Sequence, residues 1–152
     1  MQDLRDEGST GTDLADALAQ YGKELAEGSG VGFSVSIIGQ PHPLDPIIRD
    51  EVYCIEREAM ANAFRHSRAA KIEVEITYTD VIRLTVRDDG VGIDQKILDG
   101  GRAGHWGLSG MRERAQSIGA DLNLWSHPAA GTEVELIVRA KVAHQARLQG
   151  SR

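Results

Sequence analysis

The segment RDDGVGID, residues 87–94, places two aspartates and two glycines directly after an alternating apolar run. A carboxylate at the end of a strand can accept a hydrogen bond from an exocyclic amine, and glycines let the backbone approach a flat ring closely. Asp88, Gly90 and Gly92 are therefore candidates for a site that holds a flat heterocycle. The alternative is a turn that only ends a strand.

A second polar pattern lies in EAMANAFRH, residues 58–66. Glu58, Asn62 and His66 are spaced four apart, so they share one face of a predicted helix. The neutral amide oxygen of Asn62 suits Mg²⁺ whose charge is already offset by phosphates, because Mg²⁺ takes few protein ligands and keeps water. The alternative is an ordinary solvated helix face.

The segment GGRAGHWGLSGMRER, residues 100–114, carries five glycines that run into an amphipathic helix. Backbone N–H groups at a helix N-terminus bind anions, and the helix dipole strengthens that binding. The segment lacks the Lys-Ser/Thr ending of a Walker A loop, and a disordered linker is the alternative. Farther along, Gly131 and Thr132 enter the last predicted strand, which by itself indicates only a turn.

Hydrophobic periodicity predicts helices over residues 12–28, 46–64 and 108–119, and strands over residues 31–39, 71–79, 81–88, 121–126 and 132–140. The apolar side of the middle helix is expected to contain Ile47, Ile48, Val52, Ile55, Ala59 and Ala63. Because the strands alternate, we expect helices on one face of the sheet and an exposed second face. This order predicts a two-layer α+β sandwich, since no GxGxxG motif follows the first strand.

The composition and charge of the chain limit the classes of function that it can have. The 152 residues suit one domain, and no apolar run is long enough to span a membrane. The single Cys54 excludes an internal disulfide. The net charge of −6 and the lack of stacking aromatics in the basic cluster RHSRAAK, residues 65–71, argue against nucleic acid as a partner.

Over about residues 50–139, the order and spacing of four motifs resemble those of the GHKL ATPase superfamily. The motifs are E-x-x-x-N, D-x-G-x-G, G-x-x-G-L-x-G-M-R-E-R and G-T. That superfamily includes gyrase B, MutL, the heat-shock chaperone ATPases and sensor histidine kinases. The forms NAFRHS, DDGVGI and GLSGMRERA most resemble sensor kinases that pair with LuxR/NarL-type response regulators. The resemblance implies the Bergerat fold, a mixed and mostly antiparallel sheet with helices on one face, and it implies binding of ATP with Mg²⁺.

The resemblance also implies roles for single residues. Asn62 would be the Mg²⁺ ligand, Asp88 would accept the adenine amino group, and Asp89 need not touch the nucleotide. Glu58 would act as a general base or would only orient Asn62 and the metal's water. Residues 93–106 would form a lid over ATP. The remaining expected nucleotide contacts are Arg65 and His66 near the phosphates, Gly90, Gly92, Ile93 and Thr132 around adenine, and Gly107, Leu108, Ser109 and Gly110 at the phosphates.

One element of such a kinase is missing from the sequence. The phosphoacceptor histidine of this subfamily is followed by Asp or Glu, whereas the five histidines here are followed by Pro43, Ser67, Trp106, Pro128 and Gln145. We therefore expect residues 1–8 to be the tail of an upstream dimerisation helix, 9–140 the catalytic domain and 141–152 a flexible tail.

The expected function is transfer of the ATP γ-phosphate to a histidine on that missing domain, for relay to a response regulator. The fragment would be largely monomeric and would not touch a membrane, while its parent would be a membrane-bound dimer with this part in the cytoplasm. The alternatives are a stand-alone serine kinase of the anti-sigma type and a non-catalytic nucleotide-binding or scaffolding module.

Overall fold

The computed structural model describes residues 11–92, 107–127 and 129–139. The expectations for the N-terminal tail, for the lid with Ile93 and for the C-terminal tail lie outside these residues. The domain boundaries therefore stay predictions.

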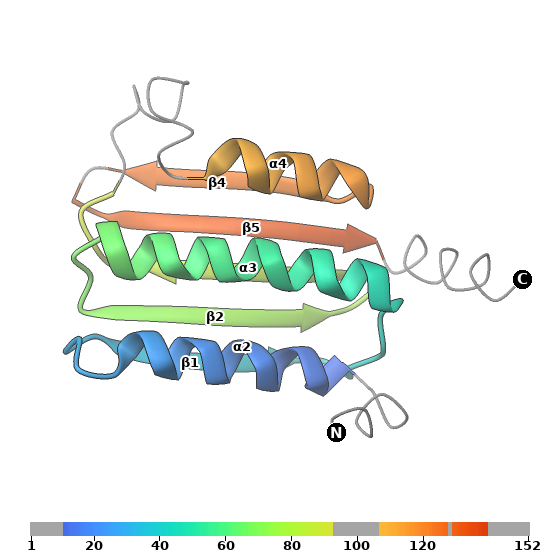
Figure 1. The fold of residues 1–152 in the computed structure, drawn as a ribbon, viewed down its shortest axis with the longest axis horizontal. Coiled ribbons are helices and arrows are strands. Elements are labelled where there is room, and N and C mark those ends of the chain that lie inside the picture. The colour runs from blue at the N-terminus through green and yellow to red at the C-terminus, as the bar shows by residue number, and fades with distance from the viewer. Residues whose placement is uncertain (1–10, 93–106, 128, 140–152) are drawn as a thin grey trace, which may run out of the picture.

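The described chain forms one five-stranded sheet and three helices, labelled as in Figure 1. The helices are α2 (Gly11–Ala26), α3 (Pro46–His66) and α4 (Leu108–Ser117), and the strands are β1 (Gly32–Ile38), β2 (Lys71–Tyr78), β3 (Val81–Asp88), β4 (Asp121–His127) and β5 (Gly131–Arg139). None of the helices in this part of the chain combines the length and apolarity that a bilayer crossing requires.

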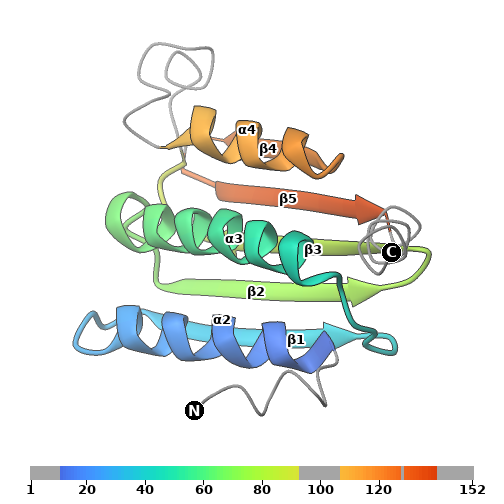
Figure 2. The ribbon, with the colours of Figure 1, turned by 45° about the vertical axis from the view of Figure 1, so that its right-hand side comes forward.

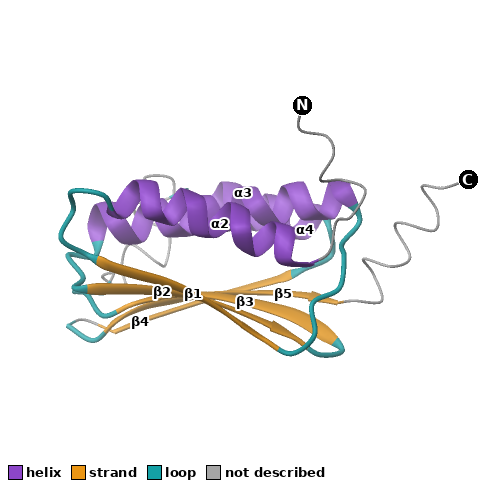
Figure 3. Cartoon of the chain, turned by 90° about the horizontal axis from the view of Figure 1, so that it is seen from below, coloured by secondary structure: helices purple, strands orange, loops and turns teal. Residues whose placement is uncertain are grey.

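The sheet has the order β1-β2-β3-β5-β4. The β1–β2 pair is parallel and the other three pairs are antiparallel. All three helices lie on one face of the sheet, as Figure 3 shows, with α2 against β1, α3 against β3 and α4 against β4 (Figure 2). The predicted two-layer α+β sandwich with a mixed, mostly antiparallel sheet is confirmed.

The core lies between the helices and the inner sheet face. Ile72, Val74 and Ile76 of β2 point into it at alternate positions, as the sequence predicts, and Val52 and Ile55 of α3 meet the sheet from above. The prediction for Ile47 was wrong, because its side chain is 72% exposed while that of Ile48 is buried. Neighbouring residues on a helix differ by about 100° in direction, so both cannot face the sheet.

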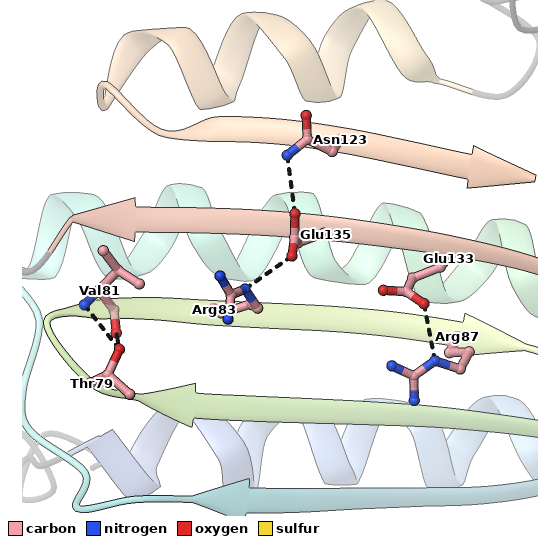
Figure 4. A network of polar contacts seen from close by, with 7 residues as sticks. All are labelled: Thr79, Val81, Arg83, Arg87, Asn123, Glu133 and Glu135. Atoms are coloured by element: carbon pink, nitrogen blue, oxygen red, sulfur yellow. Dashed lines mark hydrogen bonds and ion pairs between the residues drawn. The ribbon is translucent and has the colours of Figure 1, made fainter.

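None of the described helices covers the other face of the sheet, which carries cross-strand polar pairs (Figure 4). Glu135 forms an ion pair with Arg83 at 2.9 Å and accepts a hydrogen bond from Asn123 at 3.0 Å, and Arg87 binds Glu133 at 3.1 Å. Exposed pairs of this kind contribute little stability each, so their main effect is to keep this face solvated. The expectation of one covered and one exposed face is confirmed.

An acidic residue in the core was not predicted. The side chain of Glu56, in the middle of α3, is fully buried, and neither carboxyl oxygen has a hydrogen-bond partner among the described residues. Burial without a partner disfavours the charged form and raises the pKa of this carboxyl to about 8. Glu56 is therefore protonated in the folded protein at neutral pH.

We predict that Glu56 makes the fold less stable as the pH rises. In the unfolded chain this carboxyl loses its proton near its ordinary pKa, whereas the folded protein holds the proton up to about pH 8. Between these values the folded state binds more protons, so the free energy of unfolding should fall by about 1 kcal/mol per pH unit. Urea unfolding between about pH 5 and pH 8 should show this fall in the wild type and a flatter profile in Glu56→Gln.

The matched control is Glu113→Gln, because Glu113 lies exposed on α4. Its pH profile should follow the wild type. An identical profile for Glu56→Gln and the wild type would show that Glu56 does not titrate as its burial implies.

Candidate functional site

A small cavity lies between α3, the start of α4 and the ends of β3, β4 and β5. Its polar lining consists of Asn62, Ser67, Asp88 and Thr132, together with Gly92. The rest of the lining is apolar and comprises Ala59, Ala63, Val86, Leu108, Met111, Leu124 and Val134. The fold thus brings together five predicted site residues from segments far apart in the sequence, namely Asn62, Asp88, Gly92, Leu108 and Thr132.

The Asp88 carboxylate is the ionisable group of this cavity. Its side chain is buried at the end of β3, and one carboxylate oxygen accepts a hydrogen bond from the Gly90 backbone N–H at 2.9 Å. Burial raises the pKa of Asp88, while backbone hydrogen bonds from Gly90 and Thr132 act in the opposite direction. The carboxylate is therefore held in a fixed orientation at an apolar cavity, where it can accept a hydrogen bond from an amine.

The fold itself requires glycine at the two positions Gly90 and Gly92, independently of any ligand. A side chain on Gly90 would place its Cβ 2.0 Å from the carbonyl oxygen of Ser67, and one on Gly92 would lie 2.4 Å from that of His127. Gly92 also has a φ of +80°, which side chains disfavour. These glycines let the end of β3 pass close to α3 and β4, whether or not a ring also lies against them.

Asp89 has a different role from Asp88. Its carboxylate accepts hydrogen bonds from the backbone N–H groups of Ala70 at 2.9 Å and Lys71 at 3.0 Å, and these bonds lower its pKa. It does not line the buried cavity. Asp89 thus ties the end of β3 to the start of β2, and the expectation that it need not touch a nucleotide stays a prediction.

The N-terminus of α4 forms a second part of the site. Gly107 precedes the helix with a φ of +68° and gives it no side-chain cap, so the N–H groups of the first turn are not satisfied from that position. Glu58 reaches this point from α3, because a Cβ on Gly107 would lie 2.6 Å from its carboxylate oxygen. Beside Gly110 there is open space within 4 Å, and these residues line a hollow of about 420 Å³.

Several predicted residues are not brought into these spaces. Arg65 is exposed and His66 half-buried in the last turn of α3, and neither lines the cavity or the hollow. Ser109 faces the groove between α4 and β4 instead, so only its backbone lies at the start of the helix. Their assigned contacts to phosphates remain predictions.

The sequence reasoning missed Ser67, which caps the end of α3. Its hydroxyl donates to the Ala63 carbonyl at 2.6 Å and accepts from the Ala69 N–H at 3.1 Å, and its own carbonyl accepts from the Val91 N–H at 2.8 Å. A serine three residues after the end of the predicted helix was the signal that could have identified it. Through these bonds Ser67 positions the end of β3 next to the helix that carries Asn62.

The described residues are of the types that bind a nucleotide, but the cavity between them is narrow. Its volume of about 20 Å³ is close to that of one water, so a purine would enter only after the lining moves apart. Within the described ranges, no three acidic, histidine or cysteine side chains cluster as a metal site. A cation here would need oxygens from a ligand besides those of Asn62 and Glu58, which is how Mg²⁺ is commonly held with phosphates.

Comparison with known proteins adds independent information. Residues 48–142 match the family model described as histidine kinase-, DNA gyrase B-, and HSP90-like ATPase. The nitrate/nitrite sensor protein NarX of Escherichia coli is 38% identical over 81 residues, which are 53% of this chain and 13% of NarX. The sensor protein VraS of Staphylococcus haemolyticus is 37% identical over 92 residues, 59% of this chain and 25% of VraS. The matched region thus spans at most a quarter of these relatives.

Solved structures show the same fold. The histidine kinase domain of the Erythrobacter litoralis blue-light activated histidine kinase superposes with a TM-score of 0.69 at 22% identity, covering 91% of this chain and 63% of that one. The catalytic domain of histidine kinase ThkA gives a TM-score of 0.70 at 14% identity, covering 84% and 90%. The predicted Bergerat fold is therefore confirmed.

We predict that Gly92 and Gly110 respond oppositely to the same substitution. Gly92→Ala should lower the free energy of unfolding by about 1–3 kcal/mol, because the new methyl group meets the His127 carbonyl and φ is positive. Gly110→Ala has open space and lies in a helix, so it should raise stability by about 0.5–1 kcal/mol. Thermal or urea unfolding of both variants is the measurement, and equal effects would contradict the close approach at Gly92.

Proposed function

This chain belongs to the histidine kinase-, DNA gyrase B- and HSP90-like ATPase family, and we propose that it is the ATP-binding catalytic domain of a two-component sensor histidine kinase. The observation that carries the proposal is the convergence of the Asp88 carboxylate and Asn62 on one cavity, beside a helix N-terminus that receives no side-chain cap from Gly107. The names of NarX and VraS, both sensor proteins, support the kinase assignment over a stand-alone serine kinase.

Recognition of adenine is assigned to the buried cavity. Asp88 accepts the exocyclic amine of the base, and the apolar side chains around it pack against the ring. Thr132 lies beside Asp88 on β5, and its hydroxyl is 2.9 Å from that of Ser126. A base with a carbonyl in place of the amine would leave two acceptors facing each other, which is unfavourable in a buried site. This supports a preference for adenine over guanine.

The phosphates are assigned to the start of α4. The backbone N–H groups of Leu108, Ser109 and Gly110 point along the helix axis toward an anion at its N-terminus. Asn62 and Glu58, one turn apart on α3, are the residues that would hold or orient Mg²⁺ between the helix and the phosphates. When bound, Mg²⁺–ATP supplies the phosphoryl group, and the chain contributes positioning and charge neutralisation.

The acceptor is assigned to a histidine outside this sequence, on an upstream dimerisation domain of the same kinase. From there the phosphate would pass to a LuxR/NarL-type response regulator. A cytoplasmic location of the described domain is part of this proposal, because ATP and the regulator would be found there. By itself the chain should bind ATP and turn it over slowly.

The base assignment predicts that Asp88→Asn weakens ATP binding by about 1.5–3 kcal/mol, because a charged hydrogen-bond acceptor is lost. Selectivity for ATP over GTP should fall as well, since an amide offers both a donor and an acceptor. Titration calorimetry with ATP and GTP on the wild type and the variant measures both effects. Unchanged affinity in a folded Asp88→Asn protein would remove the adenine assignment.

The metal assignment predicts that Asn62→Ala loses the Mg²⁺-dependent part of ATP binding, about tenfold in affinity, while the fold remains intact. The comparison is ATP affinity with Mg²⁺ and with a chelator, in the wild type and the variant. Circular dichroism serves as the control for folding. If Mg²⁺ strengthens binding equally in both proteins, Asn62 is not the metal ligand.

A further inference from the structure

The hollow at the start of α4 extends across the outer side of α3 toward α2. Tyr21, Arg57, Glu58, Gly107, Gly110 and Arg114 line it. Its volume of about 420 Å³ is far larger than that of the buried cavity, and it is open without any movement of the described residues. It therefore offers room for a charged group next to the helix N-terminus.

Arg57 is held in this hollow by two aromatic rings. Its guanidinium carbon lies 4.5 Å from the ring centre of Tyr21 and 5.3 Å from that of Tyr53. Cation–π contacts of this kind restrain the guanidinium but leave its N–H donors available at the edges of the plane. Arg57 forms no ion pair with any carboxylate in the part of the chain that the structure describes.

The second arginine of the hollow differs in this respect. Arg114 binds the carboxylate of Glu51 at 2.8 Å, so its charge is already compensated. Of the two arginines that line the hollow, Arg57 is the one without a carboxylate partner among the described residues. It is also fixed by contacts with two helices, since Tyr21 belongs to α2 and Tyr53 to α3.

The Glu58 carboxylate and bound phosphates would both place negative charge at the hollow, and a cation there would offset it. The Glu58 carboxylate already lies against Gly107, at the point where the helix would receive phosphates. A nucleoside triphosphate places more negative charge there than a diphosphate does, and like charges at such short range repel. A positively charged side chain facing the same hollow reduces that repulsion, and it does so most for the outermost phosphate.

We propose that Arg57 binds the terminal phosphate of the nucleotide and thereby lets the site distinguish a nucleoside triphosphate from a diphosphate. The inference rests on the proposed function and adds a specificity residue to it. Tyr21 and Tyr53 act as positioning residues, because they hold the guanidinium plane. The position of α2 is thereby coupled to the preference for the triphosphate.

The test is titration calorimetry of the whole chain with ATP and with ADP, each in the presence of Mg²⁺. Arg57→Gln should lose about tenfold in affinity for ATP and keep the wild-type affinity for ADP. The matched control is Arg112→Gln, an exposed arginine of α4 that faces the groove on the β4 side. It should leave both affinities unchanged.

Substitutions of Tyr21 provide a second, independent test of the inference. Tyr21→Phe keeps the ring beneath Arg57 and should preserve the ratio of ATP to ADP affinity, whereas Tyr21→Leu removes the ring and should lower that ratio. Both variants must have the circular dichroism spectrum of the wild type. A purely structural role of Tyr21 would instead make Tyr21→Leu change the affinities for ATP and ADP together, with their ratio unchanged.

The possible failures have different signatures. If Arg57→Gln binds nucleotide and keeps the wild-type ratio of ATP to ADP affinity, the inference is overturned and the proposed function stands. The same holds if the wild type binds both nucleotides equally. If the folded wild type binds neither nucleotide, both the proposed function and this inference are wrong.

Discussion

The hydrogen-bonded junction between the C-terminus of α3 and the end of β3 is the constraint on which the site depends. Ser67 accepts from the Val91 N–H, Asp89 accepts from the start of β2, and Asp88 accepts from Gly90. Each bond satisfies a backbone group that would otherwise be left unpaired where the chain turns away from regular structure. Together they hold a carboxylate in an apolar cavity, next to the helix that carries Asn62.

Three sides of helix α3 face three different environments. One side packs on the sheet through Val52, Ile55 and Ala59, a second side meets α4 with Asn62 and Glu58, and the outer side carries Arg57. A helix that must present polar groups so close to its apolar side cannot be optimised for stability alone. Glu56, buried and protonated, adds a further cost within the same helix, and the structure offers no compensating contact for it among the described residues.

The elements were predictable because their signals are local. Alternation in 71–79 and 81–88 reports which side of each strand is buried, and both strands were found with their hairpin connection. The insertion of β5 between β3 and β4 was not predicted, because strand order depends on packing between segments far apart in the chain. Arg65 and His66 belong to a recognisable motif but line neither space, and their phosphate contacts stay predictions. The error at Ile47 arose because neighbouring residues on a helix face different directions.

The sequence by itself determined the types of residue available for chemistry and the faces of the strands, since side-chain chemistry and the period of a strand are properties of neighbouring residues. It also determined that an amide, a carboxylate and a glycine-rich segment follow one another at family-like spacing. Only the tertiary structure decided that Asp88 and Asn62 share a cavity, that Glu58 reaches Gly107 and that Arg57 lies between two tyrosines. Those relations join residues from separate segments, and the distances between such segments follow from packing of the whole fold.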